Sequence, residues 1–195
     1  MSWSPQQEAA LLSVHEWFKN DTKTKQVFRL FGYAGTGKTT LAKHLTEGIE
    51  GEVYFGAYTG KAAHVLRQKG CSNAGTIHSM IYNAREKSAV RLKELEAELS
   101  DYRLRGQSDS KEAESLLREI AAERQNLSRP SFSLNTSSVI KNAALIVIDE
   151  CSMVDARMGE DLLWFGVPIL VLGDPAQLPP VAGGGFFTEQ KPDIM

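Results

Sequence analysis

Residues 32–39 read Gly-Tyr-Ala-Gly-Thr-Gly-Lys-Thr, which fits the phosphate-binding pattern G-x-x-x-x-G-K-[ST]. The octapeptide follows the apolar run Val27–Phe31 and precedes residues 38–46, whose apolar side chains recur at helical spacing. The glycines let the backbone curl so that several N–H groups face one point, and the following helix adds positive partial charge there. This stretch predicts a nucleotide site between a strand and a helix.

The loop also assigns expected roles to its side chains. Lys38 would reach the β- and γ-phosphates, and the Thr39 hydroxyl would bind Mg²⁺. The sequence therefore predicts ATP and Mg²⁺ as cofactors. The candidate nucleotide-binding residues in the loop are Gly35, Thr36, Gly37, Lys38, Thr39 and Thr40.

A second pattern agrees with the first. Residues 146–150 read Ile-Val-Ile-Asp-Glu, an apolar strand that ends in two carboxylates. Beside a phosphate-binding loop, Asp149 would hold Mg²⁺, directly or through water, and Glu150 would orient or deprotonate the attacking water. Alone, the same residues would be typical of a strand that ends in acidic surface.

The expected fold is α/β, with a parallel sheet flanked by helices. The four apolar runs at 27–31, 53–57, 145–148 and 169–172 are too short for helices and rich in Val, Ile, Leu and Phe. Helical segments separate strands of this kind in parallel sheets. A first helix should begin after Ser4, with Pro5 at its first position and Gln7 at the capping-box position.

Residues 85–128 have another character and predict a helical hairpin inserted into the α/β domain. Leu92, Leu95, Leu99 and Tyr102 form one helical stripe, and interspersed Glu, Lys and Arg suit exposed helix faces. The expected domain boundaries are 1–84 together with 129–195 for the ATP-binding domain, and 85–128 for the insertion.

Composition indicates a globular domain and sets limits on its class. The 195 residues carry a net charge of −2. This charge argues against a protein that contacts nucleic-acid phosphates over much of its surface, but it allows a local basic groove. The two cysteines lack metal-site or disulfide-framework spacing, so both are expected to be reduced thiols. No signal peptide or membrane-spanning run is evident, and the expected location is cytoplasmic.

The ordered set of motifs resembles the RecD-like and Dda-like branch of superfamily 1B DNA helicases, whose N-terminal RecA-like domain carries an inserted 1B region. Members of this branch are ATP-driven translocases that move 5′ to 3′ on single-stranded DNA. The resemblance covers most of the chain outside the hairpin. The matching segments are SPQQ at 4–7, GTGKTT at 35–40, AYTGKAA at 57–63, GTIH at 75–78, DECSMV at 149–154 and GDPAQLPPV at 173–181.

The resemblance implies further site residues. Gln7 would read the adenine base, and Gln177 would sense the γ-phosphate and couple it to DNA. The catalytic set would then be Lys38, Asp149, Glu150 and Gln177. Candidate contacts to single-stranded DNA are Tyr58, Thr59, Lys61, Thr76 and His78, of which Tyr58 stands where the branch usually has proline and would stack on a base.

The family's motifs IV to VI lie in a second RecA-like domain, which these 195 residues do not include. Those motifs contain the arginines that close on the γ-phosphate. The chain is therefore expected to bind Mg·ATP, to hydrolyse it poorly, and not to unwind duplexes by itself. Phe186 and Phe187 are expected to form an exposed apolar surface for the missing domain.

Other interpretations remain open at this point. The chain would equally suit a helicase subunit of an exonuclease complex or the helicase part of a relaxase, because the local motifs do not separate these. A nucleotide kinase predicts an arginine-rich lid and no GDxxQLPPV segment. A non-catalytic ATP-binding regulator predicts leucines left exposed on both hairpin helices, whereas a structural arm predicts leucines packed between them.

Overall fold

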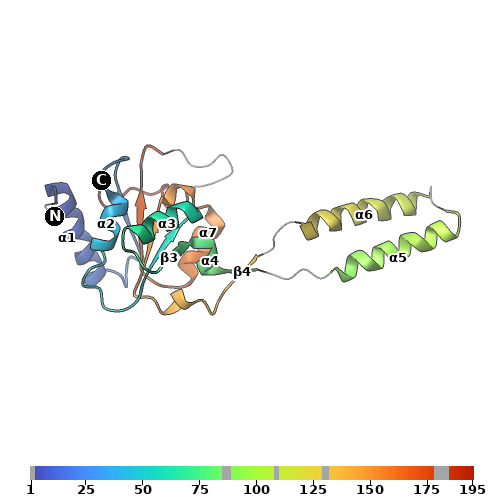
Figure 1. The fold of residues 1–195 in the computed structure, drawn as a ribbon, viewed down its shortest axis with the longest axis horizontal. Helices are drawn as coiled ribbons and strands as arrows, with labels where there is room; N and C mark the ends of the chain where they lie inside the picture. Colours follow the sequence, from blue (N-terminus) through green and yellow to red (C-terminus); the bar gives the residue numbers. More distant parts are fainter. Residues whose placement is uncertain (1–2, 85–88, 108–109, 129–131, 178–184) are drawn as a thin grey trace. The chain divides into compact units, whose positions relative to one another are not determined.

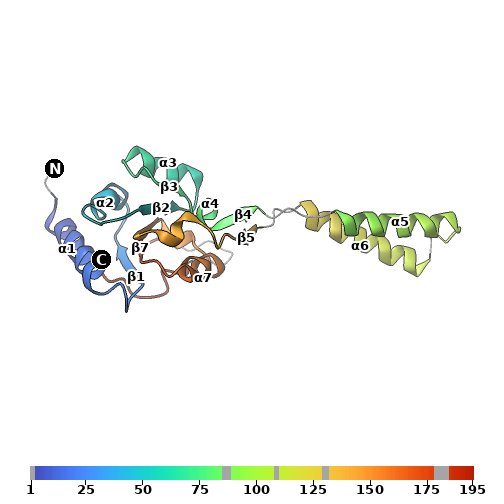
Figure 2. The same ribbon diagram turned by 90° about the horizontal axis from the view of Figure 1, so that it is seen from below.

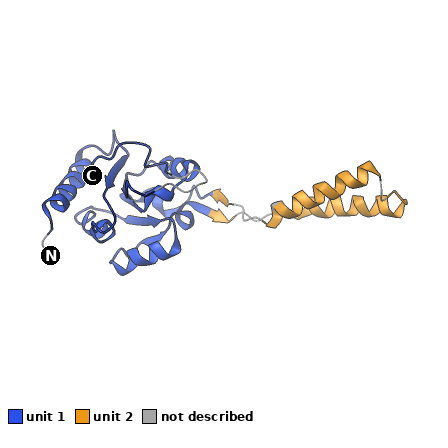
Figure 3. Cartoon of the chain, turned by 90° about the horizontal axis from the view of Figure 1, so that it is seen from above, with its two compact units in different colours: residues 1–82, 134–195 blue, residues 83–133 orange. Residues whose placement is uncertain are grey.

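The computed structural model describes residues 3–84, 89–107, 110–128, 132–177 and 185–195 (Figure 1). The chain divides into two compact units, residues 1–82 with 134–195 and residues 83–133 (Figure 3). The second unit contains the segment 85–128 that the sequence marks as an insertion. It also takes in residues of the short strands β4 (Tyr82–Ala84) and β5 (Phe132–Leu134), which form a two-stranded sheet.

The first unit is built on a five-stranded parallel sheet in the order β1-β7-β6-β2-β3. The strands are β1 (Val27–Phe31), β7 (Ile169–Gly173), β6 (Leu145–Asp149), β2 (Val53–Ala57) and β3 (Ala74–Thr76). The α/β prediction and its four apolar strands are confirmed. The strand β3 was not expected, because three residues are too few to show a periodicity.

Helices cover both faces of this sheet, and alternate side chains of each strand face opposite layers. In β6, Leu145 and Val147 pack on one side, and Ile146 and Ile148 pack on the other. Figure 2 shows α2 and α3 on the opposite side of the strands from α7. The first layer contains α1 (Pro5–Asn20), α2 (Lys38–His44) and α3 (Gly60–Gln68), and the second contains α4 (Ile77–Ile81), η1 (Val139–Asn142), η2 (Cys151–Met153) and α7 (Ala156–Trp164).

Helix α1 begins as the sequence predicts. The Gln7 amide N–H donates to Ser4 Oγ at 3.3 Å, and the Ser4 N–H donates to Gln7 Oε1 at 3.0 Å. This reciprocal pair is a capping box, and Pro5 occupies the first turn, where its missing N–H costs nothing.

The C-terminal residues contradict one expectation. Phe187 is fully buried in the layer beneath α7, and Phe186 packs against the same cluster. A Cβ on Gly159 would lie 2.0 Å from the Phe186 ring, so the glycine makes room for that ring on α7. The prediction of an exposed Phe186-Phe187 surface is therefore wrong, because the pair completes the core of its own domain.

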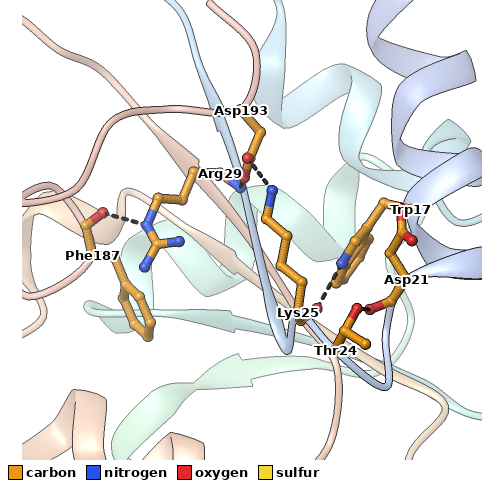
Figure 4. A network of polar contacts seen from close by, with 7 residues as sticks. All are labelled: Trp17, Asp21, Thr24, Lys25, Arg29, Phe187 and Asp193. Carbon is orange, nitrogen blue, oxygen red and sulfur yellow. Dashed lines mark hydrogen bonds and ion pairs between the residues drawn. The ribbon is translucent and has the colours of Figure 1, made fainter.

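The residues that follow return to the free edge of β1 (Figure 4). The Phe31 N–H donates to the Ile194 carbonyl at 2.9 Å, and the Arg29 N–H donates to Asp193 Oδ2 at 2.8 Å. Asp193 also accepts from Lys25 Nζ, and Arg29 Nε donates to the Phe187 carbonyl at 3.2 Å. Burial lowers the pKa of Arg29, although the charge of Asp193 opposes that shift. These contacts cover backbone groups that an edge strand otherwise leaves exposed.

The second unit has its own small core. Its helices α5 (Val90–Leu104) and α6 (Lys111–Ser128) pack through Leu95, Leu99, Ala113, Leu116 and Ile120. Charged pairs such as Arg124 with Glu96, at 2.7 Å, link the two helices on the outside. None of the helices within the described residues is long and apolar enough to span a lipid bilayer.

Candidate functional site

The loops that carry the predicted site residues leave the sheet at one edge. All five strands are parallel, so their carboxyl ends lie on the same side. Phe31, which precedes the phosphate-binding loop, pairs with Gly173, which precedes Asp174. Ala57 pairs with Asp149 on one side and with Thr76 on the other. The candidate ATP residues and the candidate DNA residues therefore share the carboxyl edge of one sheet.

The phosphate-binding loop has a backbone that only glycine adopts easily. Gly35 and Gly37 have φ angles of 82° and 84°, in the left-handed region. The Gly32 N–H donates to the Gly173 carbonyl at 3.0 Å, which attaches the start of the loop to β7. The Thr36 hydroxyl donates to the Tyr33 carbonyl at 2.8 Å and closes the turn. A loop fixed in this way can present successive N–H groups to an anion.

Lys38 lies against this loop. Its Nζ donates to the Gly32 carbonyl and, at 3.0 Å, to the Tyr33 carbonyl. The ammonium group is therefore held at the loop that the motif assigns to phosphates. Lys38 also lines a pocket of about 300 Å³ whose other lining residues are Ala34, Gly35, Gly37, Thr39, Thr40, Glu150, Asp174 and Gln177.

Asp149 and Thr39 meet at the same edge. The Thr39 hydroxyl donates to Asp149 Oδ2 at 2.8 Å, and the carboxyl group is almost fully buried. Burial raises the pKa of Asp149, while the hydrogen bond from Thr39 opposes that rise. A hydroxyl and a carboxylate are the hard oxygen donors that Mg²⁺ takes from proteins, so this pair fits the metal predicted for it.

Glu150 follows in an unusual conformation. Its φ of 56° and ψ of 50° make it the one residue other than glycine with positive φ among those described. Non-glycine residues in this region concentrate at functional sites, where surrounding contacts hold them. Glu150 lines the same pocket as Lys38, and Asp149 adjoins it through its hydrogen bonds with Thr39 and with the Glu150 N–H.

Gln177 completes that group. It lines the pocket from the loop after β7, and its Oε1 accepts a hydrogen bond from the Ser152 hydroxyl at 3.0 Å. Asp174 Oδ1 accepts from the Ala176 N–H at 2.9 Å and shapes the turn on which Gln177 sits. The rest of the predicted motif III, residues 178–181, lies outside the described residues.

A second pocket of about 350 Å³ adjoins the loop on the side of α1. Gln7 lines it, and Gln7 Nε2 donates to the Thr36 carbonyl at 3.2 Å. Gln7, which is predicted to bind the adenine base, thus also connects α1 to the phosphate-binding loop. Ile194 and Met195 line the pocket as well, and no motif in the sequence indicated them. They reach it only because the C-terminal segment returns along β1.

The candidate DNA residues line the ends of β2 and β3. Thr59 and Thr76 are N-caps: their hydroxyl oxygens accept from the Ala62 N–H at 3.2 Å and from the Ser79 N–H at 3.1 Å. Tyr58 and Lys61 are exposed beside them.

His78 is held by a neighbour. Its ring lies 4.8 Å from the ring of Tyr82, whose hydroxyl donates to Asp161 Oδ2 at 2.5 Å. Tyr82 and Asp161 were not predicted from the sequence, because nothing local links a tyrosine after α4 to an aspartate on α7. The arrangement anchors the end of α4 on α7 of the same layer.

Comparisons with known proteins give a consistent result. A family model described as an AAA domain (AAA_30) matches residues 4–192. The uncharacterized protein R530 of Acanthamoeba polyphaga mimivirus is 30% identical over 169 residues, which is 81% of this chain and 30% of that protein.

Solved structures resemble the chain as well. A structure of Pif1 helicases coordinating at forked dsDNA has a TM-score of 0.51 at 20% identity, covering 93% of this chain and 36% of that one. A Bacteroides Pif1 helicase in complex with ADP-AlF3 and ssDNA has a TM-score of 0.50 at 21% identity, covering 93% and 34%. The chain thus spans about one third of the length of these relatives. The predicted P-loop NTPase fold of RecA-like type is confirmed, while the RecD-like or Dda-like branch stays a prediction.

Proposed function

This chain belongs to the AAA domain family, and we propose that it is the ATP-binding motor domain of a DNA helicase that moves 5′ to 3′ on single-stranded DNA. ATP and Mg²⁺ are the proposed cofactors. The direction of movement and the RecD-like or Dda-like branch rest on the motif resemblance. A helicase subunit of an exonuclease or relaxase complex would use the same domain in the same way.

The observation that carries this proposal is the adjacency of two kinds of loop at one sheet edge. Strand β6 ends in Asp149, and its direct neighbour β2 ends at Ala57, followed by Tyr58 and Thr59. A rearrangement around Asp149 therefore reaches the candidate DNA loops across a single strand spacing, which is about 4.8 Å. Such closeness suits a protein in which the bound nucleotide controls the affinity for single-stranded DNA.

The charge of residues 53–85, which include β2 and the candidate DNA residues, also supports single-stranded DNA as the partner. Residues 53–85 contain no Asp or Glu, although the whole chain has a net charge of −2. Lys61, Arg67 and Lys69 are exposed within this segment. Local positive charge of this kind favours phosphate contacts that do not depend on base sequence.

The proposed chemistry assigns one task to each residue. The amides of the loop and Lys38 bind the phosphates, and Thr39 with Asp149 would hold Mg²⁺, which neutralises charge on the phosphate oxygens. Glu150 accepts the proton of the attacking water, and Gln177 contacts the γ-phosphate. Rapid turnover and unwinding are assigned to the chain together with a second RecA-like domain, whose arginine would be worth about 10³–10⁵ in rate.

The alternatives fit less well. A nucleotide kinase requires an acceptor-binding lid, whereas the inserted helices carry a balanced mixture of charges in pairs such as Arg91 with Glu119. A regulator that binds partners through the hairpin requires its leucine stripe to be exposed. Leu95, Leu99 and Leu116 instead pack between the two helices, which favours a structural arm.

The test is binding of a fluorescent ATP analogue with Mg²⁺, in the presence and absence of oligo-dT. Lys38→Ala should weaken nucleotide binding at least about tenfold, since it removes a charge-assisted contact. The matched control is Lys43→Ala, an exposed lysine of the same helix, which should leave binding unchanged. Oligo-dT should alter nucleotide affinity in the wild-type chain, and nucleotide binding indifferent to DNA would move the assignment toward a kinase or a regulator.

A further inference from the structure

We propose that Ser152 is a positioning residue that orients the side-chain amide of Gln177 so that its Nε2 group donates to the terminal phosphate of the nucleotide. The inference rests on the proposed function, which assigns Gln177 to the γ-phosphate. It adds the residue that decides which end of the amide faces that phosphate. It also links the acidic strand end to the phosphate sensor through one hydrogen bond.

Ser152 is buried. Its residue is 2% exposed, and it lies in η2, two residues after Glu150 has turned the chain out of the sheet. A buried hydroxyl needs an acceptor for its hydrogen, since water does not reach it. Among the described residues, the hydrogen bond that its Oγ makes is the one to Gln177 Oε1 at 3.0 Å.

The Ser152 hydroxyl fixes the direction of the Gln177 amide. If the amide were turned over, Nε2 would donate to Ser152 Oγ, and the serine hydrogen would lose this acceptor inside the protein. The hydroxyl therefore selects the orientation in which Oε1 faces Ser152. In that orientation both Nε2 hydrogens remain for other partners.

The two Nε2 hydrogens of Gln177 are needed in the pocket beside Lys38. Gln177 lines the pocket that also contains Lys38, Thr39, Glu150 and Asp174. A phosphate there meets two carboxylates, so an amide oxygen turned toward it would add repulsion, whereas an N–H donor adds attraction. Correct orientation of this single amide thus changes a repulsive contact into an attractive one.

The backbone supports the same arrangement. The Gln177 N–H donates to the Asp174 carbonyl at 3.1 Å, and Asp174 Oδ1 accepts from the Ala176 N–H at 2.9 Å. The main chain of Gln177 is therefore held by its own turn and its side chain by Ser152. Two independent attachments leave the amide little freedom, which favours a preorganised donor.

The experiment measures how strongly the chain distinguishes ATP from ADP. Dissociation constants of mant-ATP and mant-ADP are determined with Mg²⁺ for the wild type, Ser152→Ala, Gln177→Ala and Gln177→Glu. Ser152→Ala and Gln177→Ala should each reduce the ATP preference about tenfold and change ADP affinity by less than about twofold. Gln177→Glu keeps an acceptor for Ser152 but loses the donor, so it should reduce the preference at least as much as Gln177→Ala.

Ser138→Ala is the matched control. Ser138 is the second buried serine among the described residues, and its hydroxyl donates to the Met80 carbonyl at 2.6 Å, away from the pocket residues. Its loss should change stability without changing the ATP preference. Ser152→Thr, which restores a hydroxyl, should recover the preference lost in Ser152→Ala.

The possible results distinguish a failure of the role of Ser152 from a failure of the role of Gln177. An unchanged ATP preference in Ser152→Ala, together with a reduced one in Gln177→Ala, overturns the role of Ser152 and leaves the γ-phosphate sensor in place. Equal losses for ATP and ADP in Ser152→Ala also overturn it, because they indicate a merely structural serine. No change in either variant, with binding still dependent on Lys38, overturns the role of Gln177 itself.

Discussion

At the scale of single residues, Asp149 carries a charge in a place that disfavours it. The residue is 3% exposed at the end of a central strand, and burial raises the pKa of its carboxyl group. A raised pKa means that the folded chain binds the proton more tightly than the unfolded chain. Stability linked to this group is therefore present at acidic pH and lost as pH rises through the folded pKa.

We expect Asp149→Asn to raise the melting temperature by a few degrees at pH 7.5 in metal-free buffer, because it removes a buried charge and keeps an oxygen for the Thr39 hydroxyl. The same change should abolish Mg²⁺-dependent nucleotide binding. Thermal unfolding and mant-ATP titration measure the two effects. The gain in melting temperature should shrink as the pH falls toward 4, because protonation of the wild-type carboxyl removes the same buried charge.

Asp101→Asn provides the comparison for this prediction. Asp101 is an exposed partner of Arg105 on α5, and its replacement should change the melting temperature little at either pH. A lower melting temperature for Asp149→Asn at pH 7.5 than for the wild type would contradict the expected cost of the buried charge.

At the scale of elements, local signals predicted some parts well and others not at all. The four main strands and the start of α1 follow from apolar runs and from the Ser4–Gln7 capping box, which are properties of neighbouring residues. The strand β3 is three residues long, and α7 has only nine, so neither stands out from its surroundings. Short elements of this kind are specified by the partners they pack against.

The candidate site divides in the same way. The motifs identified Lys38, Glu150 and Gln177, which the fold brings to one pocket. They also identified Asp149, which accepts a hydrogen bond from the pocket residue Thr39. The hydrogen bond between Ser152 and Gln177 joins residues 25 positions apart and has no counterpart in a sequence pattern. The same holds for Met195 beside the phosphate-binding loop, which depends on a tertiary return of the chain.

The C-terminal segment provides a prediction about stability. Phe187→Ala should lower the free energy of unfolding by about 3–5 kcal/mol, because the ring is fully buried and its removal leaves a cavity beneath α7. Urea unfolding followed by circular dichroism measures the loss. Trp164→Ala, at a residue of α7 that is 55% exposed, should cost far less, and similar losses in both variants would contradict the placement of Phe187.

At the scale of the whole molecule, the chain contains two units with separate cores. The sheet unit has an apolar cluster on each face, and the hairpin unit has a cluster between α5 and α6. A defect in the smaller cluster should therefore remain local.

We expect Leu99→Ala to destabilise the hairpin unit by about 2–5 kcal/mol and to leave the sheet unit unchanged, since Leu99 is 6% exposed within the hairpin core. Hydrogen–deuterium exchange should accelerate in residues 90–128 while the amides of β1, β6 and β7 stay protected. Leu104→Ala, at an 83% exposed residue of the same helix, should have almost no effect. Faster exchange in the sheet strands of Leu99→Ala would contradict the separation of the cores.

The position of β1 in the sheet has a consequence for synthesis on the ribosome. Strands β2 and β3 are close in sequence and can pair early, but β1 pairs with β7 and is covered on its other side by residues near Ile194. The chain leaves the ribosome at about 5–20 residues per second, so β1 waits roughly 7–28 s for β7. The loop that follows β1 is attached to β7 through the Gly32 N–H and the Gly173 carbonyl, so this contact also forms only then. Nucleotide binding can therefore stabilise the folded domain but cannot assist the early steps of its folding.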